Sequence, residues 1–198
     1  MTRAAAPVSR PRSVPGVRLH RRQESLFVIG DLHFDHEAVI KGCDRPFGSV
    51  DERNEALIEY WNDVVGIDDT VYVLGDFTFG ASPRRVQELA DLLNGVKVFI
   101  PGTHDERSKR WFVDYATLTY RHKDFVLIHD PHDAPKTDAW IVHGHSHNKN
   151  PDYPFINPAR KTVNASAELI NYTPLRLDTL VKYLKDGRRY EILPEKRI

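Results

Sequence analysis

The stretch LFVIGDLHFDH, residues 26–36, joins a short apolar run to a cluster of acids and histidines. Four apolar residues in a row are typical of a buried strand, and the glycine that follows lets the chain turn sharply. Asp31 and His33 then come directly after the strand. A carboxylate and an imidazole at a strand end predict a ligand site at that edge of a sheet.

The same arrangement recurs four more times along the chain. The apolar runs are VYVLG (71–75), VKVFIPG (96–102), FVLIH (125–129) and WIVHG (140–144). The acids and histidines that end or follow these runs are Asp76, His104, Asp105, His129, His145 and His147. The carboxyl ends of strands in an α/β sheet share one edge, so we expect these side chains to converge. Mixed carboxylate and imidazole donors without a thiolate favour Mn²⁺, Fe or Zn²⁺ in a catalytic site over a structural zinc.

Composition sets the class of protein but indicates no partner. The chain has 198 residues, with 28 basic and 28 acidic side chains, so its formal net charge is zero. That length suits a single domain, which we place at residues 24–198. No apolar run approaches the about 20 residues of a membrane span, so we expect no membrane partner. The single cysteine, Cys43, excludes an intrachain disulfide and fits a reducing compartment, so we expect a cytoplasmic protein.

The first 23 residues differ in composition from the rest of the chain. Residues 1–22 carry six arginines, three prolines and no acid. Because prolines break the amphipathic helix of a transit peptide, we interpret residues 1–23 as a mobile basic arm. Such an arm could make weak contacts with nucleic-acid phosphates, although a terminus without function is the simpler hypothesis.

The remaining pattern predicts an α/β protein with a mixed sheet. Helices are expected from Ser49 to Gly66, from Ser82 to Gly95 and over residues 176–186, each with an apolar face and cap residues or a glycine stop. Strands are expected at 26–29, 71–74, 96–100, 117–121, 124–129, 139–143 and 161–166, with Lys123 and Asp124 in a hairpin turn. A βαβαβ half followed by a β-rich half indicates mixed pairing.

These motifs, taken in order, resemble the calcineurin-like metallophosphoesterases. The shared elements are Asp-x-His, Gly-Asp, Gly-x-His-Asp, a lone histidine and Gly-His-x-His, and the resemblance runs from about residue 25 to 192. The runs Asp31–His36, Arg45–Phe47 and Gly75–Phe77 look like the small bacterial and phage branch of that family. The resemblance implies a four-layer α/β/β/α sandwich of mixed sheets. It also implies two divalent metal ions, Mn²⁺ first, with Fe, Zn²⁺ or Ni²⁺ as alternatives.

The resemblance also assigns roles to single residues. The first metal would be held by Asp31, His33 and His147, and the second by His129 and His145, with Asp76 bridging the two. His104 would face the substrate phosphate and protonate the leaving oxygen, with Asp105 orienting its imidazole. A hydroxide bridging the metals would be the nucleophile.

Thr103 departs from the family pattern, which has asparagine there to bind the second metal and the substrate phosphate. Threonine offers only a hydroxyl, a weak neutral ligand with one donor. We therefore expect weaker binding at the second metal site and one lost phosphate contact. Two interpretations follow: a natural protein with a compromised second site, or a chain with an engineered substitution that slows turnover.

The resulting prediction is a metal-dependent phosphodiesterase acting on small or cyclic phosphodiesters, with monoesters second. One alternative is a nuclease that grips DNA or RNA with the basic arm. The other is a catalytically weak scaffold that keeps the fold and serves a partner, which Thr103 leaves open. Fold alone would not decide among them.

Several of these residues also have simpler interpretations. Asp31 and Asp76 suit helix N-caps, and His129 by itself would more often be structural. We expect His143 to point away from the site, and His36 to lie either in the substrate pocket or in the scaffold. Phe77 and Phe79 could stack a base at the pocket mouth, with ordinary packing as the alternative. Arg107, Lys109 and Arg110 could meet an anionic substrate or form a solvated helix face.

Overall fold

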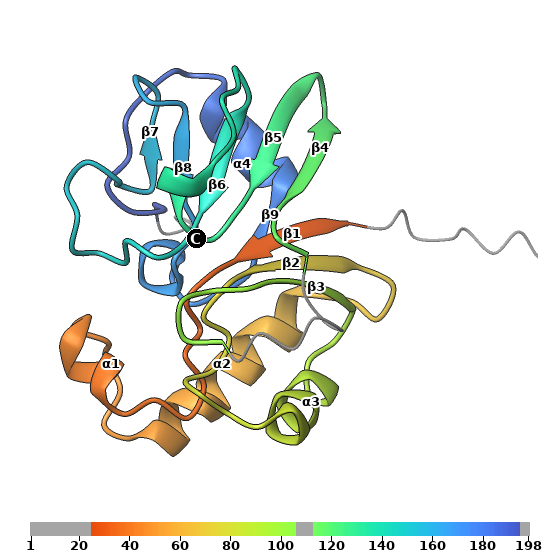
Figure 1. The fold of residues 1–198 in the computed structure, drawn as a ribbon, viewed down its shortest axis with the longest axis vertical. Helices are drawn as coiled ribbons and strands as arrows, with labels where there is room; N and C mark the ends of the chain where they lie inside the picture. The colour runs from red at the N-terminus through yellow and green to blue at the C-terminus, as the bar shows by residue number, and fades with distance from the viewer. Residues whose placement is uncertain (1–24, 106–112, 195–198) are drawn as a thin grey trace, which may run out of the picture.

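The structure, a computed structural model, describes residues 25–105 and 113–194 (Figure 1). The arm predicted at residues 1–23 and the basic residues Arg107, Lys109 and Arg110 lie outside these ranges. The elements in chain order are β1 (Leu26–Ile29), α1 (Ala38–Gly42), α2 (Val50–Val64), β2 (Thr70–Leu74), α3 (Pro83–Asp91), β3 (Val96–Ile100), β4 (Ala116–Tyr120), β5 (Lys123–Leu127), η1 (Pro131–Asp133), β6 (Trp140–His143), β7 (Ile156–Asn157), β8 (Thr162–Asn164), η2 (Ala167–Ile170), β9 (Leu175–Arg176) and α4 (Leu177–Leu184).

Two mixed sheets organise the described residues. The first has the order β3-β2-β1-β9, with β1, β2 and β3 parallel and β9 antiparallel to β1. The second has the order β4-β5-β6-β8-β7, with β5, β6 and β8 parallel and an antiparallel strand at each edge. Helices α2 and α3 lie on one side of the first sheet, and the second sheet and α4 lie on the other (Figure 1). The predicted α/β fold with mixed sheets is confirmed.

The central strands are mostly buried, as expected for parallel strands covered on both faces. Val28 and Ile29 of β1 and Val71 and Val73 of β2 are all 0% exposed. The helices begin where their caps predict. Ser49 Oγ accepts the Glu52 N–H at 3.1 Å before α2, and Ser82 Oγ accepts the Arg85 N–H at 3.3 Å before α3.

Two local predictions are wrong. Lys123 and Asp124 lie in β5, and the hairpin turns at Arg121 and His122, whose φ angles are 47° and 62°. A two-residue turn of this kind normally carries Asn-Gly, so Arg-His gives no turn signal. The helices expected above also leave out residues 38–42, which form α1, a helix of only five residues without a side-chain cap.

Within the described residues, the longest helices are too short or too polar to cross a membrane.

Candidate metal centre

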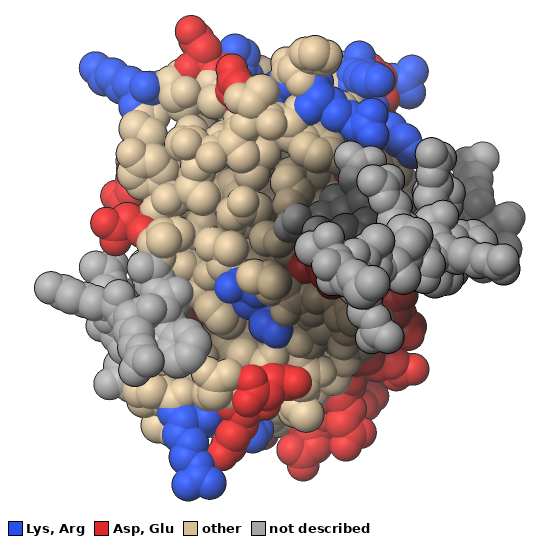
Figure 2. Space-filling model, turned by 90° about the vertical axis from the view of Figure 1, so that its right-hand side faces the viewer, with Lys and Arg blue, Asp and Glu red and all other residues tan. Residues whose placement is uncertain are grey.

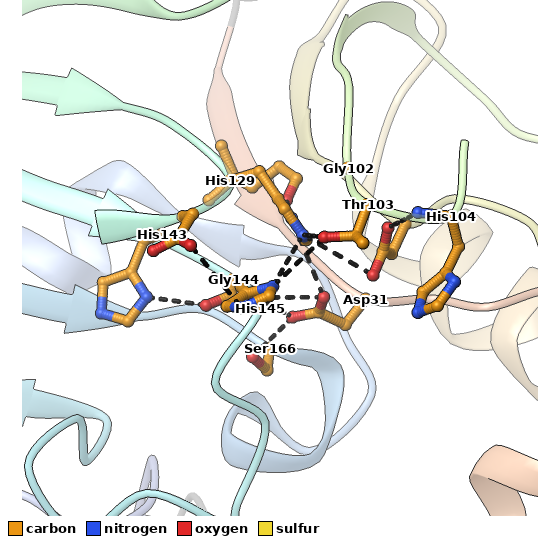
Figure 3. Close-up of polar contacts among 12 residues, drawn as sticks. Asp31, Gly102, Thr103, His104, His129, His143, Gly144, His145 and Ser166 are labelled. Atoms are coloured by element: carbon orange, nitrogen blue, oxygen red, sulfur yellow. Dashed lines mark hydrogen bonds and ion pairs between the residues drawn. The ribbon is translucent and has the colours of Figure 1, made fainter. Parts of the chain in front are cut away.

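Five loops meet at the carboxyl ends of strands from both sheets (Figure 3). They follow β1, β2, β3, β5 and β6. Backbone hydrogen bonds tie them together: the Asp31 N–H donates to the Gly75 carbonyl at 3.0 Å, and the Gly144 N–H donates to the His129 carbonyl at 3.1 Å. These hydrogen bonds hold the loops of the two sheets together at the base of the site.

Asp31, His33 and His147 form the first group of candidate ligands. Each offers an atom within 4.8 Å of the others. Burial lowers the pKa of His33 to about 2, helped by repulsion from His147 and Arg45, so the ring is neutral, the form that binds a metal. His33 Nε2 is buried and has no hydrogen-bond partner. An orphaned ring nitrogen costs free energy unless another group, such as a cation, occupies the space in front of it.

Asp76 lies between two histidines. Its Oδ2 is 3.5 Å from His33 Nε2 and 3.6 Å from His129 Nε2. Its Oδ1 accepts the backbone N–H of His104 at 2.8 Å. The carboxylate is 2% exposed, and Asp31, Asp76 and His129 form another group whose ligand atoms lie within 4.8 Å. One oxygen placed between two imidazole nitrogens can serve two cations at once.

His129, His145 and Thr103 form the second group. His129 Nδ1 donates to the Leu74 carbonyl at 2.9 Å, so in the neutral ring Nε2 carries the lone pair. That Nε2 lies 3.2 Å from His145 Nδ1, and Thr103 Oγ1 is 3.5 Å from each of these nitrogens. The hydroxyl of Thr103 therefore belongs to this group, but only a neutral ligand is present where a second carboxylate or amide oxygen would bind more strongly.

The backbone of the candidate ligands is strained. Five of them adopt left-handed φ angles between 46° and 64°: Asp31, His33, Asp76, His145 and His147. Such angles cost free energy for residues other than glycine and persist only where the surroundings enforce them. Their concentration here supports a functional interpretation over simple helix capping.

Two glycines make room for the candidate ligands. A Cβ on Gly102 would lie 2.1 Å from Asp76 Oδ1. A Cβ on Gly75, which has a φ of 83°, would lie 2.3 Å from His129 Nδ1. Only glycine therefore lets Asp76 and His129 approach each other.

His104 lies beside the two groups of candidate ligands, and Asp105 does not have its predicted role of orienting the His104 imidazole. The His104 side chain is exposed, with its ring centroid 5.5 Å from that of His33. The Asp105 carboxylate accepts backbone N–H groups from Phe77 at 3.0 Å, Thr78 at 3.3 Å and Gly102 at 2.9 Å. Oδ1 thus ties the β3 loop to the β2 loop, and Oδ2 closes a turn within the β3 loop. Asp105 therefore fixes the backbone around Asp76 and does not orient the His104 imidazole.

Three charged residues hold the site without having been predicted. Arg45 donates to the carbonyls of Asp31 and Leu32 at 2.5 and 2.8 Å, and Arg53 donates to the carbonyls of His33 and His36 at 2.6 Å each. Their guanidinium groups hold the strained β1 loop in place. Glu168 Oε1 accepts from Arg45 Nε at 2.8 Å and from His147 Nδ1 at 3.1 Å. This hydrogen bond fixes the His147 ring so that its other nitrogen, Nε2, points away from the Glu168 carboxylate.

Glu168 also forms a group with Cys43 and His147 whose ligand atoms lie within 4.8 Å. Burial alone would raise the pKa of Glu168, but the His147 hydrogen bond and the Arg45 charge lower it to about 2. Arg45 Nη2 is 2.6 Å from Glu168 Oε1, so this carboxylate already has a cation. The Cys43 group is for that reason the poorer candidate for a metal, and His147 fits the Asp31 group better.

Replacing Glu168 with alanine should weaken divalent-metal binding about 10- to 100-fold, the usual effect of losing a residue that orients a ligand. Glu168→Gln should weaken it less, because an amide oxygen can still accept from His147 Nδ1. Titration calorimetry with Mn²⁺ measures the affinity, and circular dichroism checks the fold. Glu88→Ala, which removes an exposed ion pair with Arg84 on α3, is the control. Unchanged Mn²⁺ affinity in a folded Glu168→Ala protein would contradict this positioning role.

His143 points away from the groups (Figure 3). Its Nδ1 donates to the Gly144 carbonyl at 2.7 Å, and its ring is fully buried against Tyr153. Its place matches the expectation that it packs outside the site.

The residues present fit divalent cations. Asp31 and Asp76 are carboxylates buried near each other, and such a pair is stable only with compensating positive charge. The arginines beside them donate to main-chain carbonyls and Glu168, and the neighbouring His33 is neutral. Burial lowers the pKa of His147, but its hydrogen bonds to Cys43 and Glu168 and the charge of Asp31 raise it to about 11, so without a metal His147 supplies part of the positive charge and a bound metal must displace its proton. Carboxylate and imidazole donors around an orphaned His33 nitrogen are what Mn²⁺, Fe or Zn²⁺ require.

Comparisons with known proteins agree with this geometry. The family described as calcineurin-like phosphoesterase matches residues 25–185. An uncharacterized protein of Methanocaldococcus jannaschii is 45% identical over 168 residues, which cover 82% of this chain and 93% of that protein. The gene 66 protein of Mycobacterium phage D29 is 27% identical over 179 residues, covering 72% of this chain and 88% of the phage protein.

The fold is also similar to that of a solved structure. The crystal structure of a protein of unknown function from Aquifex aeolicus superposes with a TM-score of 0.62 at 23% identity, and covers 81% of this chain and 99% of that one. At that identity the likeness supports the fold alone.

Proposed function

The chain belongs to the calcineurin-like phosphoesterase family, and from that premise we propose that it is a phosphodiesterase acting on small or cyclic phosphodiesters. Family membership makes it a metal-dependent phosphoesterase. The observation that carries the proposal is the position of Asp76 Oδ2, 3.5 Å from His33 Nε2 and 3.6 Å from His129 Nε2. This position supports two cation sites that share one carboxylate.

The two sites would use different sets of residues. Asp31, His33 and His147 would hold one cation, and His129, His145 and Thr103 the other, with Asp76 contacting both. Mn²⁺ is our first choice, because the donors are oxygen and imidazole nitrogen. When bound, such ions stabilise negative charge on phosphoryl oxygens and lower the pKa of a water molecule.

His104 is the proposed proton donor to the leaving oxygen. Its imidazole is exposed, so a substrate can reach it. Its backbone N–H bonds Asp76 Oδ1 at 2.8 Å, which fixes the residue beside the proposed cations. An imidazole held at the edge of the site can deliver a proton to an alkoxide as it departs.

The described charges favour a diester over a monoester. A monoester carries an extra negative charge, which arginine side chains usually hold in pairs of hydrogen bonds. Among the described residues near the site, Arg45 and Arg53 are committed to main-chain carbonyls, and Arg85 pairs with Asp35 at 2.7 Å. A diester carries one negative charge fewer than a monoester, so it needs fewer free arginine side chains at the site.

The nuclease alternative depends mainly on residues 1–23, which lie outside the described ranges. On the face shown in Figure 2, the described Lys and Arg side chains lie in separate groups at the top, near the centre and at the bottom, and form no continuous band. Nothing on that face therefore supports a track for a nucleic-acid backbone. A scaffold without a metal would not explain why the His33 nitrogen has no partner or why the loops that carry the candidate ligands are strained.

Hydrolysis by protein stripped with EDTA and reloaded with Mn²⁺ tests the proposal. We expect kcat/KM for bis-p-nitrophenyl phosphate to exceed that for p-nitrophenyl phosphate by about tenfold or more, the factor that about 1.4 kcal/mol gives. Activity should disappear in EDTA and return with Mn²⁺. A preference for the monoester would overturn the diester assignment, and hydrolysis that persists in EDTA would overturn the metal dependence.

A further inference from the structure

Phe79 is an exposed aromatic ring beside the candidate metal centre. It follows β2 in the same loop as Asp76, and its side chain is 48% exposed, whereas Phe77 is 1% exposed in the core. An isolated exposed apolar residue needs no explanation. This one has a partner: the His36 ring stacks on it, with centroids 3.9 Å apart and an angle of 13° between planes. We name this pair, Phe79 and His36, the ring shelf.

The ring shelf is held from both sides by loops that carry candidate ligands. His36 Nδ1 lies 3.4 Å from His33 Nδ1, and the His36 carbonyl accepts from Arg53 at 2.6 Å. On the other side, the N–H of Gly80, next to Phe79, donates to the His104 carbonyl at 3.1 Å. The two rings are therefore fixed relative to the site before any substrate arrives, which lowers the entropic cost of stacking.

The ring shelf adjoins the proposed proton donor. The His104 ring centroid is 4.9 Å from that of Phe79 and 6.3 Å from that of His36. A group attached to the leaving oxygen would lie beside His104, and thus beside the ring shelf. His36 also lines an open groove of about 410 Å³, with Ala38 and Ile40 of α1 among its other lining residues. The ring shelf therefore borders free space.

We propose that the ring shelf binds a planar aromatic group on the leaving side of the substrate, so that the enzyme selects aryl or nucleoside phosphoesters over alkyl ones. This selectivity rests on the proposed function and adds the substrate class. Stacking on an aromatic side chain suits any flat ring and needs no hydrogen-bond readout. The shared chemistry is a flat ring joined to phosphorus, directly or through a sugar.

Two matched pairs of ligands isolate the contribution of the ring. Phenylphosphonate and methylphosphonate differ by one aromatic ring, and AMP and ribose 5-phosphate differ by the base. We expect each ring-bearing ligand to bind the Mn²⁺-loaded protein about tenfold tighter than its partner, within the usual range for one stacked ring. Isothermal titration calorimetry measures the dissociation constants, and an assay for free phosphate checks that AMP and ribose 5-phosphate stay intact during the titration.

Variants at Phe79 then assign the preference to the ring shelf. Phe79→Ala should reduce both affinity ratios to about one, and Phe79→Trp should keep them, because the indole also stacks. Tyr60→Ala, which removes an exposed ring from α2, should leave both ratios unchanged. A preference for the base without one for the phenyl ring would identify nucleosides as the class, and the reverse would identify simple aryl esters.

Equal affinity of ring-bearing and ring-free ligands for the wild-type protein would overturn the ring shelf, as would ratios that survive Phe79→Ala. Neither result bears on phosphodiester hydrolysis, which is measured separately with bis-p-nitrophenyl phosphate. Failure of that hydrolysis, with ratios that still depend on Phe79, would overturn the proposed function and leave the ring shelf as a binding site.

Discussion

Asp76→Asn should lower Mn²⁺-dependent hydrolysis of bis-p-nitrophenyl phosphate by about 10³-fold. The substitution keeps the shape of the side chain but removes the charge that faces His33 Nε2 at 3.5 Å and His129 Nε2 at 3.6 Å. Both cation sites lose their shared ligand, and the several kcal/mol that ions contribute to a phosphoryl-transfer transition state correspond to about three powers of ten in rate. Steady-state kinetics at saturating Mn²⁺ measures the effect.

The metal-free protein gives the matching control for Asp76→Asn. In EDTA the variant should melt at the same temperature as the wild type or higher, because a buried negative charge close to Asp31 is gone. In Mn²⁺ the wild type alone should gain stability from binding. A variant that keeps more than about a tenth of the wild-type kcat, a loss of no more than about 1.4 kcal/mol, would contradict the shared-carboxylate account.

Thr103→Asn should raise kcat for the same substrate by about tenfold or more. Thr103 Oγ1 lies 3.5 Å from both His129 Nε2 and His145 Nδ1, so its side chain already points at the second group. An asparagine there offers a stronger oxygen ligand and an NH₂ donor for a phosphoryl oxygen. Removing one preorganised donor costs about 10²- to 10³-fold in other hydrolases, so restoring one can recover a part of that loss.

Thr103→Val is the matched control, because it keeps the branched shape and removes only the hydroxyl. We expect this variant to lose affinity for the second metal equivalent in a Mn²⁺ titration, whereas Thr103→Asn gains it. Equal titrations for threonine, valine and asparagine at this position would show that residue 103 does not reach the second site.

The sequence predicts the convergence of the loops because the signal is repeated. Five apolar runs each end beside an acid or a histidine, and the carboxyl ends of parallel strands in one sheet share an edge. That rule accounts for the loops after β1, β2 and β3 in one sheet and for those after β5 and β6 in the other, but it does not predict that the two sheets bring their edges together. The structure brings together Asp31, His33, Asp76, Thr103, His129, His145 and His147. Their assignment as metal ligands stays a prediction that the experiments above address.

The residues that the sequence did not reveal act through contacts remote in the chain. Glu168 meets Arg45 across 123 residues, in a one-turn η2 segment without any motif. Arg53 lies in the first turn of α2, where an arginine is normally a solvated helix residue, yet it is 0% exposed and donates to the His33 carbonyl. Hydrogen bonds from side chains to main-chain carbonyls leave no periodic pattern in the sequence, so these roles could not be predicted from it.

The role of Asp105 could not be read from its neighbour in the sequence. An Asp after His104 suggests a carboxylate that orients an imidazole, but adjacent side chains in a tight turn point in different directions. The buried carboxylate instead bonds three backbone N–H groups from two loops. The sequence shows that an acid follows His104, but the partners of its carboxylate depend on how the β2 loop packs on the β3 loop.

The anomalous signal from crystals soaked in Mn²⁺ would locate the bound cations. We expect two peaks that both contact Asp76, one bounded by Asp31, His33 and His147 and the other by His129 and His145. The second peak should be weaker, because Thr103 is a poor ligand. A single peak, a peak beside Cys43 and Glu168, or no peak at Asp76 would contradict the account.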